Sequence, residues 1–341
     1  MLLLILFFHI PINGTFSIVA MDPETSEWGI AVASRVLDVG YIVPWLKAEV
    51  GAVATQALSN PYYGPWALEA LSKGKNAEEA LKIILAKDST PEDRQVGIVD
   101  RYGTSAAHTG KSTIEWSGHR TDKYLSIQGN ILVGPEVIDS MFIKFKKTKG
   151  VLAERLLSAL QAGEKAGGDS RGKQSASIIV VRKRGGYLGV DDRLVDLKVV
   201  DNEEPVIELR RQYELWQYAF LAPAYLRLSN EEDSRKIFIE KAHFLLQKAL
   251  KSEIKNANVY NNLAWQFALM KKYPEETILA AKKAHTLSPE DANIMDTYAE
   301  ALYAAGKYEE AVSWEKNALK IEPENEFFKE QLRKFKEALK K

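Results

Sequence analysis

The residue best suited to do chemistry is Thr15, which heads the β-rich run TFSIVA after fourteen largely apolar residues. If those residues are removed, Thr15 becomes the N-terminal residue. Its free α-amine, with an ordinary pKa of about 7.7 to 8.0, can then accept the hydroxyl proton near neutral pH. The hydroxyl oxygen becomes a nucleophile with its own base. The alternative is that Thr15 is an ordinary strand residue behind a signal peptide.

The segment before Thr15 resembles an export signal. Leu2 to Phe8 is an unbroken apolar run, too short to cross a bilayer, and Pro11, Asn13 and Gly14 form a polar exit. No basic residue precedes the run, so a second interpretation stays open: a propeptide that the protein removes itself. Residues 1–14 are therefore predicted to be a signal peptide or a propeptide, and either process exposes Thr15. We expect an extracytoplasmic protein, periplasmic or secreted, with a cytoplasmic location as the alternative.

The composition excludes several classes of function. The chain has no cysteine, and its 46 basic and 46 acidic residues cancel, so it offers neither a thiolate metal site nor a field that attracts nucleic acid. No two of its five histidines share a metal-ligand spacing. We expect no metal, no cofactor, no nucleic-acid partner and no membrane span, while homo-oligomerisation stays open. With 341 residues the chain is long enough for two domains.

Two further clusters have polar side chains where they are costly to bury unpaired. Gln128 and Asn130 fall within a strand-like run, where they could line a pocket or donate hydrogen bonds to an oxyanion. Asp169 and Arg171 lie in a glycine-rich loop, where Arg171 could pair with Asp169 or grip a substrate carboxylate. His119 is the best polar candidate among the histidines. Turn, bulge and loop-anchoring chemistry is the alternative for all three groups.

The elements that position these residues alternate in groups. Short strands and paired helices follow one another up to about Tyr218. In the first helix pair, the second helix follows Gly74 and opens with a capping box of Asn76 and Glu79. Paired helices between strand groups argue against a doubly wound parallel sheet. Two antiparallel sheets between helix layers satisfy the pattern. The expected strands are 15–20, 28–34, 51–56, 95–100, 104–109, 125–133, 175–182 and 187–199, and the expected helices are 65–72, one from 76, 135–145 and 151–166.

The C-terminal part repeats itself. Pro289 and Pro323 are 34 residues apart, the period of tetratricopeptide repeats, and Gly306 separates the two helices of the second unit. A helix over 236–250 and a polar closing helix over 326–339 are expected to complete the array. Such stacked helix pairs present a concave surface to a protein or peptide. A stabilising extension without a ligand is the alternative.

Several segments in the same order resemble the family catalogued as domain of unknown function 1028. They are TFSIVA at 15, VATQA at 53, NPYYGP at 60, WSGH at 116, SIQGNIL at 126 and the GGD loop at 167. The resemblance covers residues 15 to about 216. It implies similarity to the N-terminal nucleophile hydrolases, whose fold is a four-layer αββα sandwich. It also implies that Gln56 and Asn60 belong to the substrate-binding set.

A comparison with proteasome-type members of that superfamily adds three residues. Those members carry an Asp before a Ser-Arg pair at the end of the second strand, and a Lys at the next strand start that lowers the pKa of the nucleophile. Here Ala33 precedes Ser34 and Arg35, so the acid is missing. Lys47 lies at a comparable distance from Thr15 and would take the basic role.

The sequence thus predicts an α+β domain over 15–218 with the N-terminal nucleophile sandwich, followed by an all-α repeat domain over 230–341. We expect hydrolysis of an amide bond in a peptide or small amide, with a protein partner on the repeats. Thr15 and Lys47 would be catalytic. The substrate-binding candidates are Ser34, Arg35, Gln56, Asn60, His119, Gln128, Asn130, Asp169 and Arg171. The competing hypothesis is an inactive binding or scaffold protein that keeps the fold.

Overall fold

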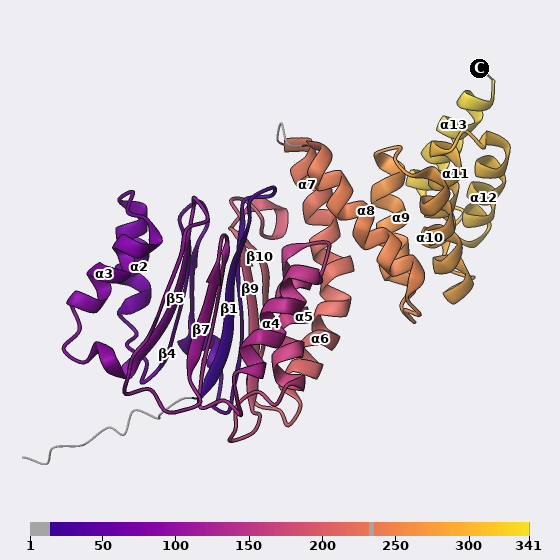
Figure 1. Ribbon diagram of the computed structural model, residues 1–341. Coiled ribbons are helices and arrows are strands. Elements are labelled where there is room, and N and C mark those ends of the chain that lie inside the picture. Colours follow the sequence, from indigo (N-terminus) through magenta and orange to yellow (C-terminus); the bar gives the residue numbers. More distant parts are fainter. Residues whose placement is uncertain (1–13, 232–234, 341) are drawn as a thin grey trace, which may run out of the picture. The chain divides into compact units, whose positions relative to one another are not determined.

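The computed structural model describes residues 14–231 and 235–340, so the predicted leader lies outside the described residues except for Gly14. The chain divides into two compact units, one ending at Tyr213 and the other beginning at Glu214 (Figure 1). All strands of the described chain lie in the first unit, and the second contains helices alone. The predicted change from a mixed α and β part to an all-helical part is confirmed.

The first unit contains two antiparallel sheets. One has six strands in the order β10-β9-β2-β1-β8-β7, and the other has four in the order β3-β4-β5-β6. The six-stranded sheet contains β1 (Thr15–Asp22), β2 (Glu27–Ser34), β7 (Gly118–Asp122), β8 (Leu125–Asn130), β9 (Ser175–Val181) and β10 (Arg193–Val199). The four-stranded sheet contains β3 (Pro44–Lys47), β4 (Gly51–Ala57), β5 (Arg94–Asp100) and β6 (Ser105–Thr109). Antiparallel pairing throughout is what paired helices between strand groups predict.

Helix pairs cover the outer faces of the two sheets. In Figure 1, α2 and α3 lie against the sheet that holds β4 and β5, and α4 and α5 lie on the far side of the other sheet. The predicted capping box is present: the Asn76 side chain accepts from the Glu79 amide at 2.9 Å, and Glu79 accepts from the Asn76 amide at 3.0 Å. The helices are α1 (Val39–Ile42), α2 (Tyr63–Ser72), α3 (Ala77–Ala86), α4 (Glu136–Lys147) and α5 (Leu152–Lys165), with short helical turns at Pro91–Asp93 and Tyr187–Gly189.

Strand β1 has buried side chains on both of its faces. Val19 and Met21 belong to the apolar core between the sheets, which includes Ala54 of β4. The alternate residue Phe16 points the other way, because a Cβ on Gly163 of α5 would lie 3.2 Å from its ring. A strand with both faces covered reads as a continuous apolar run, as TFSIVAM does.

Four strands differ from the sequence prediction. Strand β3 was not predicted, and β7 falls in a segment expected to be a loop. The last strand begins at Arg193, not at residue 187, because a short helical turn with Leu188 at φ 54° precedes it. Strand β8 ends at Asn130, three residues early, because Ile131 takes φ 53°, which breaks the pleat.

The second unit is a series of antiparallel helix pairs. The pairs α9 with α10 and α11 with α12 begin 35 residues apart and end 34 apart, and α13 spans the predicted closing segment. Gly306, at φ 78°, makes the turn in the second pair. The helices are α6 (Pro205–Trp216), which crosses the boundary between the units, a π-helical segment (Gln217–Leu221), α7 (Ala222–Glu231), α8 (Arg235–Lys251), α9 (Ala257–Leu269), α10 (Pro274–Leu287), α11 (Ala292–Ala304), α12 (Tyr308–Ile321) and α13 (Glu326–Leu339). Among the helices of the described residues, none is both long and apolar enough to cross a membrane.

Candidate functional site

Thr15 is the first residue of a central strand. It lies opposite Ser34 of β2 on one side and Asn130 of β8 on the other, and it is fully buried. Its Oγ1 donates to Ser34 Oγ at 3.1 Å. The hydroxyl predicted to be a nucleophile is therefore held by a neighbouring hydroxyl at the ends of two paired strands.

The peptide carbonyl that precedes Thr15 is held by two donors. The Gly14 oxygen accepts a hydrogen bond from Ser34 Oγ and a second, of 3.0 Å, from Arg171 Nη2. Gly14 has no room for a side chain, because a Cβ there would lie 2.9 Å from both Arg171 Nη2 and Asp169 Oδ2. A hydroxyl and a guanidinium thus polarise the one carbonyl that is covalently bound to Thr15.

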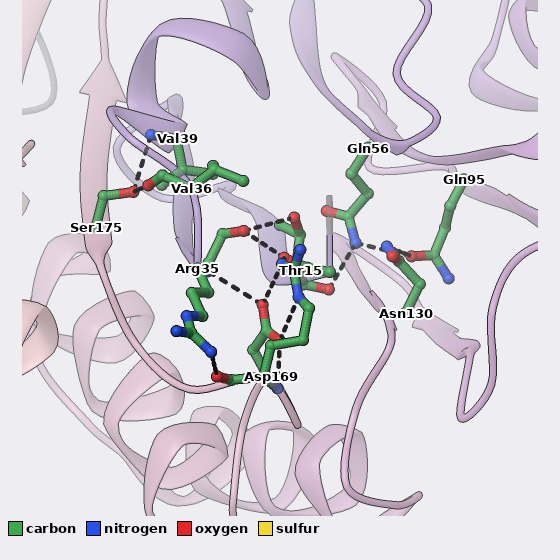
Figure 2. Close-up of polar contacts among 12 residues, drawn as sticks. Thr15, Arg35, Val36, Val39, Gln56, Gln95, Asn130, Asp169 and Ser175 are labelled. Atoms are coloured by element: carbon green, nitrogen blue, oxygen red, sulfur yellow. Dashed lines mark hydrogen bonds and ion pairs between the residues drawn. The ribbon is translucent and has the colours of Figure 1, made fainter. Parts of the chain in front are cut away.

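Asp169 organises this end of the sheet (Figure 2). Its side chain is 1% exposed and accepts from Arg171 Nε at 3.0 Å, Arg171 Nη2 at 2.7 Å and the Arg35 amide at 3.1 Å. The loop that carries it is tied to the strand ends, since the Ser170 amide donates to the Ile131 carbonyl at 2.9 Å. The carboxylate orients Arg171 toward Gly14, so the two residues that the sequence singled out act as a pair.

A buried polar network lies between the two sheets beside Thr15. Gln56 Nε2 donates to the Thr15 carbonyl at 3.2 Å and to Gln95 Oε1 at 2.8 Å, and Asn130 donates to the same Gln95 oxygen at 3.0 Å. Gln128 Nε2 donates to Ser17 Oγ at 2.6 Å, and that hydroxyl donates to Gln56 Oε1. All five side chains are essentially inaccessible to solvent. Buried amide groups without hydrogen-bond partners destabilise a fold. The hydrogen bonds among these side chains therefore hold the network rigid.

His119 lies at the outer end of this network, not at Thr15. Its Nδ1 is 2.8 Å from Thr109 Oγ1, which accepts from Gln95 Nε2 at 2.9 Å. Desolvation of the ring and the nearby His108 imidazole lower the pKa of His119. A neutral ring with its proton on Nε2 can accept a hydrogen bond at Nδ1 from the Thr109 hydroxyl.

The structure does not bring Lys47 or Asn60 to Thr15. Lys47 is exposed at the edge of the four-stranded sheet, paired with Gly51, whereas Gln56, five residues further along β4, is the residue that reaches Thr15. At about 3.3 Å per residue, that separation is roughly 17 Å along the strand. Asn60 donates to Asp88 at 2.8 Å and anchors the turn before α2. Lys47 therefore cannot lower the pKa of the nucleophile by contact, because the chain turns into β3 with that residue pointing outward.

Sequence reasoning missed Gln95 and Ser175. Ser175 Oγ donates to the Val36 carbonyl at 2.6 Å and accepts from the Val39 amide at 3.0 Å, which holds the segment after β2 in place. The polar side chain of Gln95, second residue of β5, was a usable signal in the sequence, although only the opposing sheet shows which groups it bonds. The described residues contain no group of three or more histidines and carboxylates able to bind a metal.

Comparisons with known proteins cover the two parts of the chain separately. The model of the family described as "Family of unknown function (DUF1028)" matches residues 15–209. A crystal structure of protein SPO2555 from Silicibacter pomeroyi, of the same family, aligns with a TM-score of 0.56 and 29% identity, over 62% of this chain and 92% of that one. No curated protein matches.

Two solved repeat domains align with a smaller share of the chain. One is the first tetratricopeptide domain of Spaghetti (RPAP3) bound to an HSP90 peptide, covering 35% of this chain and 94% of that one. The other is the first such domain of human RPAP3, covering 35% and 91%. Each shows 22% identity and a TM-score of 0.27.

Proposed function

This chain belongs to the family of unknown function DUF1028, and we propose that its first unit is an amide-bond hydrolase that uses Thr15 as an N-terminal nucleophile. The proposal includes the assignment of this unit to the N-terminal nucleophile sandwich. Two antiparallel sheets with helix pairs on their outer faces support that assignment (Figure 1). The substrate is a peptide or a small amide, and the protein acts outside the cytoplasm.

One observation carries the proposal: the carbonyl bonded to Thr15 accepts hydrogen bonds from Ser34 and Arg171 while the Thr15 hydroxyl lies against Ser34. Once the leader is gone, a substrate carbonyl takes the place of the Gly14 carbonyl. The same two donors then stabilise the oxyanion that forms there. Strand pairing on both sides of Thr15 keeps the nucleophile from moving.

The reaction proceeds in two steps. The Thr15 hydroxyl passes its proton to its own α-amine, and its oxygen forms a bond to the substrate carbonyl carbon. The carbon–nitrogen bond breaks, and the departing amine takes the proton from the α-ammonium. Water then attacks the Thr15 ester, which releases a carboxylic acid and restores the hydroxyl.

The alternative is a binding protein that has lost the chemistry. Two observations favour it: Ala33 stands where an acid would precede Ser34, and Lys47 lies far from Thr15. The second unit would bind a protein or peptide in either case. A groove of about 550 Å³ in that unit, lined by Arg235, Lys236 and Tyr273 among others, supports this role.

The experiment is covalent labelling with an epoxyketone or β-lactone, combined with the intact mass of the purified chain. We expect a chain that begins at Thr15 and carries one label. Thr15→Ala should remove the label, Thr15→Ser should retain it, and Thr121→Ala, at an exposed position of β7, should label normally. A chain that begins elsewhere, or equal labelling of Thr15→Ala, would refute the nucleophile and leave the binding protein.

A further inference from the structure

Two guanidinium groups lie at the Thr15 end of the sheets, but only one of them, that of Arg171, is paired with a carboxylate. Arg171 directs both Nε and Nη2 to Asp169, and Nη2 also donates to Gly14. Its side chain is 29% exposed. Arg171 is therefore already neutralised by a carboxylate, so the substrate carboxylate suggested for it by sequence would have to displace Asp169.

Arg35 differs because Asp169 contacts its backbone amide and not its guanidinium. The Arg35 guanidinium donates through Nη1 to the Arg171 carbonyl, an uncharged acceptor, and the residue is exposed. Among the described residues no carboxylate forms an ion pair with it. Figure 2 shows the side chain running alongside Asp169, next in sequence to the serine that contacts Thr15.

The carboxylates of the neighbouring loops are paired with cations other than Arg35. Asp169 balances Arg171, and Lys173, the next cation along the loop, has Glu204 at 2.6 Å and Glu164 at 3.5 Å. Asp38, on the other side of Arg35, pairs with Lys198 at 2.7 Å. Each of these four carboxylates is thus paired with a cation other than Arg35. The Arg35 fork is left to meet an anion brought by a ligand.

We propose that Arg35 selects substrates whose acyl part carries a carboxylate, so that the site prefers acidic amides such as glutamyl or aspartyl compounds over neutral or basic ones. The role of Arg35 in selecting a substrate rests on the proposed function. Binding of a carboxylate by Arg35 requires no hydrolysis. A guanidinium and a carboxylate form two parallel charge-assisted hydrogen bonds, which a neutral amide cannot reproduce.

Binding separates this inference from the reaction. The affinity of the purified chain is measured by titration calorimetry for two compounds of nearly equal shape, N-acetylglutamate α-amide and N-acetylglutamine α-amide. We expect the carboxylate to bind about tenfold or more tightly than the neutral compound. Arg35→Gln should abolish the difference, and Arg35→Lys should keep part of it. The control Arg193→Gln removes the same charge from an exposed arginine, the first residue of β10, which pairs with Val181 at the far end of β9. This control should leave the difference in affinity unchanged.

Equal affinities in the wild type, no measurable binding of either compound, or a preference that survives Arg35→Gln would overturn the anion site. Loss of the preference in Arg193→Gln as well would overturn it too, because the effect would then follow net charge. A wild type that prefers the carboxylate but is not labelled at Thr15 supports the anion site and refutes the hydrolase. The two failures are therefore distinguishable.

Discussion

A buried pair of carboxyl groups in the second unit allows a test of stability against pH. Glu315 of α12 is fully buried, Asp296 of α11 is 4% exposed, and neither Glu315 oxygen nor Asp296 Oδ1 has a hydrogen-bond partner in the described structure. Burial, and then the neighbouring Asp296, raise the pKa of Glu315; burial also raises the pKa of Asp296. The adjacent Glu300 is already satisfied by Gln331 and Lys334 of α13, at 2.9 and 2.5 Å.

The sign follows from proton linkage. A carboxyl with a raised pKa in the folded state keeps its proton there while the unfolded chain loses it. Its stabilising contribution is complete below the ordinary pKa of 4.5 and falls as pH rises toward the folded value. Keeping Glu315 protonated at pH 7 costs about 1.4 kcal/mol for each unit above 4.5, or about 3 kcal/mol. Glu315→Gln removes that cost, because the amide is neutral at every pH and can donate to Asp296.

Hydrogen exchange of the full chain, read on the amides of α11, α12 and α13, measures the effect without requiring this unit to be isolated. At pH 7 and above, Glu315→Gln should slow exchange by a factor corresponding to about 1 to 3 kcal/mol after correction for intrinsic rates. At pH 5 the variant and the wild type should differ little. The control Glu330→Gln, on the exposed face of α13, should match the wild type throughout. Equal stabilisation at pH 5 and pH 8 would refute the raised pKa of Glu315.

Two further substitutions test the first unit by thermal denaturation. Asp169→Asn removes the charge that binds Arg171 and should cost about 2 to 4 kcal/mol, while Asp139→Asn, at an exposed ion pair, should cost less than about 1. Gly97→Ala would place a Cβ 2.0 Å from Gln128 Oε1, so the polar network must open, at a cost of about 2 kcal/mol or more. Unchanged melting temperatures for either variant would contradict the packing described for these residues.

Local patterns were enough to predict most elements of this chain. Three of these patterns are the capping box at Asn76, the buried apolar run of β1 and the spacing of about 34 residues between successive helix pairs. Each depends on residues that are close in sequence. Such signals survive because a capping side chain or an apolar stripe acts within a few turns of the backbone. The strand-like pattern around Gln128 and Asn130 also indicated that these two polar side chains need hydrogen-bond partners.

The partners themselves come from the packing of distant segments. Gln95 lies 35 residues from Asn130 and meets it only because the two sheets face each other, and Asp169 reaches Arg35 across 134 residues. Spacing along the chain predicted that Lys47 lies beside Thr15. In the structure Lys47 pairs with Gly51, at the end of β4 opposite to Gln56, which is the residue that contacts Thr15. Residue types thus show which groups can react or bind a charge. Which of them meet depends on sheet register and loop paths, which are set by contacts between residues far apart in the sequence.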